Sequence, residues 1–165
     1  WGENSVSVSH GPLVYALKIG ETWNHVDSID RWGSFDEVRP SDPWNYGLLE
    51  SAVEDPDNGF EFVELRPGNS AENNVVQDST GTHGEDAMWK AEVTSSYPWT
   101  AENAPVALRT KGKIIPDWKL YREMAGPLPH SLPLKHLENE PPDEITLIPY
   151  GCSTLRITEF PLLDR

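Results

Sequence analysis

The sequence predicts an all-β fold, an antiparallel β-sandwich of jelly-roll-like form with long Pro- and Gly-rich loops. The chain has 165 residues, the size of one domain, so residues 1–165 are expected to form a single unit. Fifteen prolines and twelve glycines recur at short intervals and leave little room for long helices. Between them lie short apolar, β-branched and aromatic segments, several of which alternate with polar residues as half-buried strands do.

Nine segments are expected to be strands. In chain order they are residues 5–8, 13–19, 44–49, 60–65, 87–93, 106–109, 118–121, 145–149 and 155–159. The segment 13–19 is apolar almost throughout, which predicts a central strand with both faces covered. In the segment 155–159, Leu155 and Ile157 are expected to face the core. Arg156 between them is expected to pair with a carboxylate on the outer face.

The segment 44–53 has two interpretations. Asp42 as N-cap and Pro43 at the first position would start a helix of two turns. A strand is preferred for 44–49, because Gly47 would allow close approach of a neighbouring backbone. Three long stretches, 20–42, 67–86 and 126–143, are expected to be irregular loops that cover a sheet edge or pack on a neighbour.

The charge of the chain restricts its partners. Twenty-seven acidic residues against thirteen basic ones give a formal net charge of −14. Such a surface repels the phosphates of nucleic acid and of anionic lipid unless a basic stripe is present. Since no apolar run reaches the roughly 18–20 residues of a membrane span, neither nucleic acid nor a membrane is expected as a partner.

Cofactor and metal motifs are absent. The sequence has no glycine-rich phosphate loop, and its five histidines and one cysteine lack zinc-site spacing. The segment Asp55-Pro56-Asp57-Asn58-Gly59 offers oxygen ligands of the kind that calcium takes. It lacks the register of a calcium loop and is preferred as a hairpin turn. No cofactor and no metal is therefore expected.

No catalytic residue is assigned. Cys152 has no histidine close in sequence and is expected to be a small buried apolar residue. Paired carboxylates could perform glycoside hydrolysis. Two acidic groups are candidates: Glu50, Glu54, Asp55 and Asp57, and Glu138, Glu140, Asp143 and Glu144. Because acidic residues are so frequent, solvated faces are the preferred interpretation of both groups.

A group of aromatic and polar side chains could bind carbohydrate. Flat indole rings stack on sugar rings, and carboxylates and guanidinium groups bond to sugar hydroxyls. The candidates in and beside the stretch 20–42 are Trp23, Trp32, Trp44, Asp27, Asp30 and Arg31. The alternative is that these tryptophans anchor the loop to the body of the domain.

Two segments resemble a known family. Residues 6–17, which contain Gly11-Pro12-Leu13-Val14-Tyr15, look like a strand of the bacterial β-L-arabinofuranosidase-like glycoside hydrolases. Residues 147–161, which contain Pro149-Tyr150-Gly151, are similar to the end of related long proteins. Trp44-Asn45-Tyr46 and residues 114–118 also resemble this region.

The resemblance implies a C-terminal β-sandwich region that follows a catalytic α/α-barrel. The family's catalytic glutamate and metal-bound cysteine cluster belong to that barrel, and no segment here matches them. The parent protein is then a secreted or periplasmic bacterial polysaccharide-degrading enzyme. A start at Trp1, without an initiator methionine, also suggests a piece cut from a longer chain.

Three functions remain open. The preferred one is a non-catalytic accessory domain that packs on and supports the catalytic barrel, with a plant-type polysaccharide or oligosaccharide as a further partner. An alternative is an independent carbohydrate-binding module that uses the loop tryptophans. A second alternative is a free-standing carboxylate-dependent glycosidase. For an accessory domain, an apolar contact patch is expected around Trp1 and residues 126–133.

Overall fold

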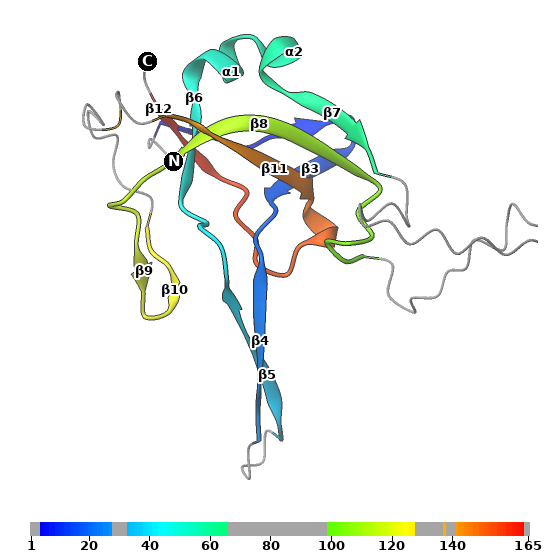
Figure 1. The fold of residues 1–165 in the computed structure, drawn as a ribbon, viewed down its shortest axis with the longest axis vertical. Coiled ribbons are helices and arrows are strands. Elements are labelled where there is room, and N and C mark those ends of the chain that lie inside the picture. The colour runs from blue at the N-terminus through cyan, green and yellow to red at the C-terminus, as the bar shows by residue number, and fades with distance from the viewer. Residues whose placement is uncertain (1–3, 28–32, 66–98, 128–136, 138–140, 164–165) are drawn as a thin grey trace, which may run out of the picture.

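A computed structural model describes residues 4–27, 33–65, 99–127, 137 and 141–163. These residues are mostly β: one main sheet of eight strands, two small hairpins and two short helices (Figure 1). The sheet is mixed and not wholly antiparallel, because β12 (Phe160–Leu163) runs parallel to its neighbour β6 (Tyr46–Leu49). In the described ranges neither a closed barrel nor a sandwich is formed.

The main sheet follows the order β1-β12-β6-β8-β11-β3-β2. The remaining bounds are β1 Ser5–Val6, β8 Val106–Ile114, β11 Asp143–Pro149, β3 Leu13–Leu17 and β2 Ser9–His10. An eighth strand, β7 (Glu61–Glu64), also pairs with β8. Although β1 and β2 lie at opposite ends of this order, only Ser7 and Val8 separate them in sequence. The sheet therefore curls until its two ends lie close together.

The main core joins strands from across the curled sheet. Its fully buried members come from β3, β6, β8, β11 and β12: Tyr15, Leu17, Leu48, Leu108, Ile145, Leu147 and Phe160, with Ile19 after β3. Tyr15, Ala16 and Leu17 are consecutive and each is at most 2% exposed. Because neighbours in a strand point to opposite faces, both faces of β3 are covered at these three residues, as predicted. The predicted central place is wrong, because Leu13 and Val14 are exposed and β3 lies next to the end of the sheet.

A helical excursion interrupts the strand beside β8. β6 ends in a pair with Gly112, and β7 begins opposite Arg109, so two residues of β8 face no strand on this side. Between β6 and β7 lie α1 (Glu50–Glu54) and α2 (Pro56–Gly59). The Thr110 hydroxyl donates to the Gly59 carbonyl at 2.7 Å and fastens the excursion to the sheet.

Two of the sequence predictions concern this excursion and the strand before it. The strand preferred over 44–49 is confirmed at its end, and the competing helix occupies only the next five residues. The predicted hairpin turn at 55–59 is wrong: Pro56 begins one helical turn, which leads from α1 into β7. Gly59 suits this place because a Cβ atom there would lie 2.4 Å from the Ala52 carbonyl oxygen.

The predicted irregular loop at 20–42 is instead a hairpin. β4 (Glu21–Val26) and β5 (Phe35–Pro40) pair over their full length, and the hairpin projects from the main sheet (Figure 1). Almost all of its side chains are exposed or only partly buried. The apolar alternation that reveals a half-buried strand is therefore missing from its sequence.

A second, shorter hairpin lies beside the first. β9 (Leu120–Tyr121) pairs with β10 (Met124–Ala125) through a two-residue turn. Both turn residues have positive φ, 50° at Arg122 and 63° at Glu123. That conformation is typical of a type I′ turn, which normally takes Asn and Gly.

The predicted strand at 155–159 is wrong. This segment is not part of a ladder, although the Ile157 carbonyl accepts a hydrogen bond from the Leu17 amide at 2.8 Å, and β12 begins only at Phe160. Leu155 and Ile157 pack against the core as expected. Arg156 pairs with no described carboxylate. Its Nε donates to the Ser153 carbonyl at 2.8 Å, and its guanidinium lies 4.5 Å from the Tyr150 ring centre.

Cys152 is buried, as predicted, at 2% exposure among Ala104, Ala107 and Ile148. Burial raises the pKa of its thiol above the ordinary value, which disfavours a thiolate nucleophile. Other predictions lie outside the described residues: the strand at 87–93, the loop at 67–86, most of the stretch 126–143 and the patch at Trp1.

Candidate functional site

A hollow of about 560 Å³ lies between the two hairpins and the body of the domain. We call it the hairpin groove. One wall is β5, from Val38 to Pro40, and the other is the β9–β10 hairpin with Leu120 and Met124. The body contributes Trp44 and the segment 155–157. Its volume falls within the range of roughly 300–1,000 Å³ that is typical of ligand pockets.

The two walls are joined by an ion pair. Arg39 of β5 donates through Nη2 to Oε2 of Glu123 at 3.0 Å, and the same nitrogen lies 3.6 Å from Glu37. At the foot of the second hairpin, Trp118 Nε1 donates to the Gly126 carbonyl at 3.0 Å. The ion pair links the two hairpins, and the Trp118 bond closes the foot of the second one.

Trp23 and Trp44 have different environments. Trp23 is 57% exposed and lies opposite Val38, on the face of the hairpin away from Arg39, and it is not among the residues that line the groove. Its Nε1 donates to Glu21 at 3.1 Å, which orients the ring. Trp44 is half-buried and packs edge-on against Trp118 at 5.1 Å between ring centres. Trp44 is thus mainly an anchor, whereas Trp23 is free to make contacts.

The other predicted sugar-binding residues lie away from the groove or are not described. The Asp27 side chain is 93% exposed at the outer end of β4, with its carboxylate 3.5 Å from His25 Nε2. Nδ1 of His25 lies 2.7 Å from Asp36 across the hairpin. Trp32, Asp30 and Arg31 fall outside the described residues. Of the predicted sugar-binding residues that the structure describes, Trp44 lines the groove, whereas Trp23 and Asp27 do not.

Sequence reasoning missed the second wall. Leu120, Tyr121 and Met124 are 49%, 59% and 66% exposed. The segment 118–121 was recognised as strand-like, but its exposure depends on the hairpin that it forms. An Asn-Gly turn would have signalled that hairpin, whereas Arg122-Glu123 does not.

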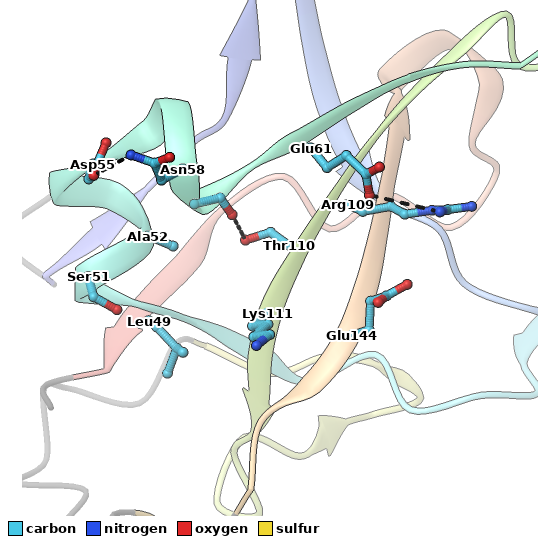
Figure 2. A pocket seen from close by; sticks show the side chains of 11 residues that line it. Leu49, Ser51, Ala52, Asp55, Asn58, Glu61, Arg109, Thr110, Lys111 and Glu144 are labelled. Carbon is cyan, nitrogen blue, oxygen red and sulfur yellow. Dashed lines mark hydrogen bonds and ion pairs between the residues drawn. The ribbon is translucent and has the colours of Figure 1, made fainter.

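A second, polar cavity of about 360 Å³ lies beneath the helical excursion. Figure 2 shows Asp55 and Asn58 on its helical side, where the Asn58 amide donates to Asp55 at 2.8 Å. On the sheet side Arg109 lies 3.9 Å from Glu61, with Lys111 and Glu144 nearby. Carboxylates and cations alternate around this cavity, as on a solvated sheet surface.

The acidic candidates in the described ranges form no group that could hold a metal ion. No three His, Cys, Asp or Glu side chains in the described ranges could together hold a metal ion. Glu50 and Glu54 begin and end α1. Asp55 lies just before α2, and Asp57 lies within it. Glu138 and Glu140 lie outside the described residues.

No protein-family model matches this chain, and no curated protein or solved structure matches it significantly. None of the helices in the described part of the chain is long and apolar enough to cross a membrane.

Proposed function

We propose that this chain is a non-catalytic accessory domain of a bacterial polysaccharide-degrading glycoside hydrolase. In this proposal the hairpin groove and the hairpins beside it pack on the catalytic domain of the parent polypeptide. The short motifs quoted above suggest this family, and the parent enzyme would work outside the cytoplasm.

One observation carries the proposal: both hairpins leave large apolar side chains exposed. They are Trp23, Phe35, Leu120, Tyr121 and Met124, each at least 49% exposed. Contacts between domains of one chain bury roughly 600–1,500 Å² and use exposed apolar side chains of this kind. A neighbouring domain seated on these hairpins would cover them.

We also propose that the curled sheet belongs to a jelly-roll-like sandwich. The support is the segment 5–10, which pairs through β1 with β12 and through β2 with β3. A strand that passes from one layer to the other is a known way to join sandwich layers. An experimental structure in which residues 5–10 pair with only one of these strands would contradict the proposal.

The test is binding between this chain and the catalytic domain, expressed as two polypeptides and mixed in a calorimeter. The proposal expects an association that Met124→Glu weakens, because a charge would be buried at the contact. Asp57→Lys in α2, at the other end of the domain, serves as the control. The absence of association, or hydrolysis of nitrophenyl glycosides by this chain alone, would contradict the proposal.

A second candidate function is direct binding of carbohydrate at the hairpin groove. It is favoured by Trp23, whose exposed ring is oriented by Glu21 on β4, the strand paired with the groove wall β5. Trp23→Ala would then weaken glycan binding by about 1–2 kcal/mol, as for hot-spot residues, and leave the melting temperature nearly unchanged. Trp23→Phe is the matched control because it retains a ring. If Trp23→Ala lowers stability and leaves glycan binding unchanged, this function is excluded.

A further inference from the structure

The β4–β5 hairpin is an unusual structure for a domain to leave in solvent. An isolated two-stranded hairpin is marginally stable at best in water and normally needs one buried face. Here the described residues cover the hairpin only in part: no side chain from Glu21 to Val26 or from Phe35 to Pro40 is fully buried. Its contacts with the rest of the described chain include Glu21 with the Leu155 amide and Arg39 with Glu123. A partner that covered both faces would supply the missing contacts.

Each face of this hairpin carries one exposed aromatic ring with carboxylates beside it. Trp23 lies on one face with Asp36, and Phe35 lies on the other with Glu37. A pair of side chains directly opposite each other shares a face, so the register fixes this division. The hairpin is therefore a two-sided arm, which we call the acidic arm.

The charge of the acidic arm indicates the chemistry of its partner. Residues 21–27 and 33–40 contain four carboxylates and one arginine, so their formal charge is −3 with His25 neutral. Arg39 is already shared between Glu37 and Glu123, and His25 lies between Asp27 and Asp36. Bringing this arm against a negative surface would cost energy, and against a positive one would gain it.

The same charge argues against other occupants. A second copy of the chain brings its own net charge of −14 and its own acidic arm. Nucleic acid and anionic lipid are repelled in the same way. A protein groove rich in lysine and arginine, with apolar surface to receive the two rings, fits both the charge and the exposed aromatics.

We infer that the acidic arm inserts into a cationic groove on the catalytic domain of the parent polypeptide. This inference rests on the proposed function and names the chemistry of its contact. The attraction steers the two domains together, and the rings of Trp23 and Phe35 pack once the arm is inside.

The experiment measures the dissociation constant between this chain and the separately expressed catalytic domain. For the unaltered chain, raising NaCl from about 50 mM to about 500 mM shortens the screening length and is expected to weaken binding about tenfold. Asp27→Lys together with Glu37→Lys is expected to weaken binding by at least that factor. Asp57→Lys together with Glu102→Lys changes the net charge equally, away from the arm, and should change binding less than about threefold.

Each outcome decides the inference. Binding that tolerates both salt and the arm substitutions would overturn the inference but leave the proposed accessory role intact, because the two domains would still associate. No binding at any salt concentration would overturn both. A dimer of this chain that the arm substitutions dissociate would assign the arm to a second copy and overturn the inference. The salt titration uses the unaltered chain, so it decides the matter even if a variant misfolds.

Discussion

The guanidinium group of Arg39 and the carboxylate of Glu123 meet at 3.0 Å, although 84 positions separate them in sequence. Arg39 comes from β5 and Glu123 from the turn between β9 and β10. The pair therefore connects the two hairpins across the hairpin groove. Both side chains are more than half exposed, so the contact sets the geometry of the hairpins more than the stability of the domain.

Glu123→Gln tests this role. Because exposed ion pairs contribute about 0–1 kcal/mol, the free energy of unfolding should fall by less than about 1 kcal/mol. Backbone amides of β9 and β10 should nevertheless exchange faster with deuterium, because the shorter hairpin loses its ion pair with Arg39. Glu102→Gln is the control. Unchanged exchange in β9 and β10 would show that Arg39 does not restrain them.

The turn at Arg122 and Glu123 is a site of backbone strain. Residues other than Gly, Asn and Asp seldom adopt positive φ, yet Arg122 and Glu123 both adopt it here in succession. Arg122→Asn should raise the free energy of unfolding by about 0.5–1 kcal/mol, since Asn tolerates this conformation. Arg122→Val should lower it. Urea unfolding of both variants checks the prediction, and a loss of stability in the Asn variant would contradict it.

The hairpin β4–β5 shows why part of the fold could not be predicted from sequence. Strands such as β3 reveal themselves because burial selects apolar residues such as Tyr15 and Leu17. The acidic arm fully buries neither face, so its sequence lacks the regular alternation of apolar and polar residues that marks a half-buried strand. Its six cross-strand pairs are long-range relationships that a reading along the chain does not detect.

Segment 155–159 shows the opposite error. Its alternation is real, and Leu155 and Ile157 do contact the core. An extended segment that lies over a core has the same pattern as a strand, and only a ladder partner separates the two. The parallel pairing of β12 with β6 could not be predicted from sequence either, because nothing local distinguishes parallel from antiparallel neighbours in strands this short.

The candidate site could be predicted only in part. Trp23 and Trp44 were both recognised as candidates, but their sequence neighbourhoods do not tell a surface ring from an anchor. The difference arises from Trp118, which packs on Trp44 from 74 positions away and has no counterpart at Trp23 in the described residues. The residues of the second hairpin were missed because their turn lacks the usual signature.

The Tyr15 hydroxyl is buried and has no hydrogen-bond partner among the residues that the structure describes. Since an unsatisfied buried polar group costs about 1–3 kcal/mol, Tyr15→Phe should raise the free energy of unfolding by about 1 kcal/mol. Tyr150→Phe removes an exposed hydroxyl and is the control, with little change expected. A clear loss of stability in Tyr15→Phe would show that the hydroxyl is bonded, for example to a buried water.

The same residue predicts a dependence on pH. Burial raises the pKa of Tyr15 above its ordinary value of 10.0. Tyr15 then ionises more readily in the unfolded chain, so its contribution to stability is complete below about pH 10 and is lost as the pH rises further. Urea unfolding at about pH 8 and about pH 11 measures this loss, which should be smaller in Tyr15→Phe. An equal loss in both proteins would contradict the assignment.

Gly59→Ala tests the close contact between the two helices. The added methyl group would meet the Ala52 backbone, which cannot move aside as a flexible side chain can. The free energy of unfolding should fall by about 1–3 kcal/mol, the usual cost of overpacking. Gly151→Ala is the control, because its nearest contact would be an ordinary 3.8 Å to Trp99. Equal stability of the two variants would mean that the excursion shifts freely on the sheet.

Hydrogen exchange of the β4–β5 amides, measured in this chain alone and after addition of the catalytic domain of the proposed parent enzyme, tests the central claim most directly. The claim is that the hairpins form the contact with a neighbouring domain. It predicts that the amides from Glu21 to Val26 and from Phe35 to Pro40 exchange rapidly in the isolated chain. The catalytic domain should slow them, while those of β8 and β11 stay unchanged. Slow exchange in the isolated chain, or no change on adding the catalytic domain, would contradict it.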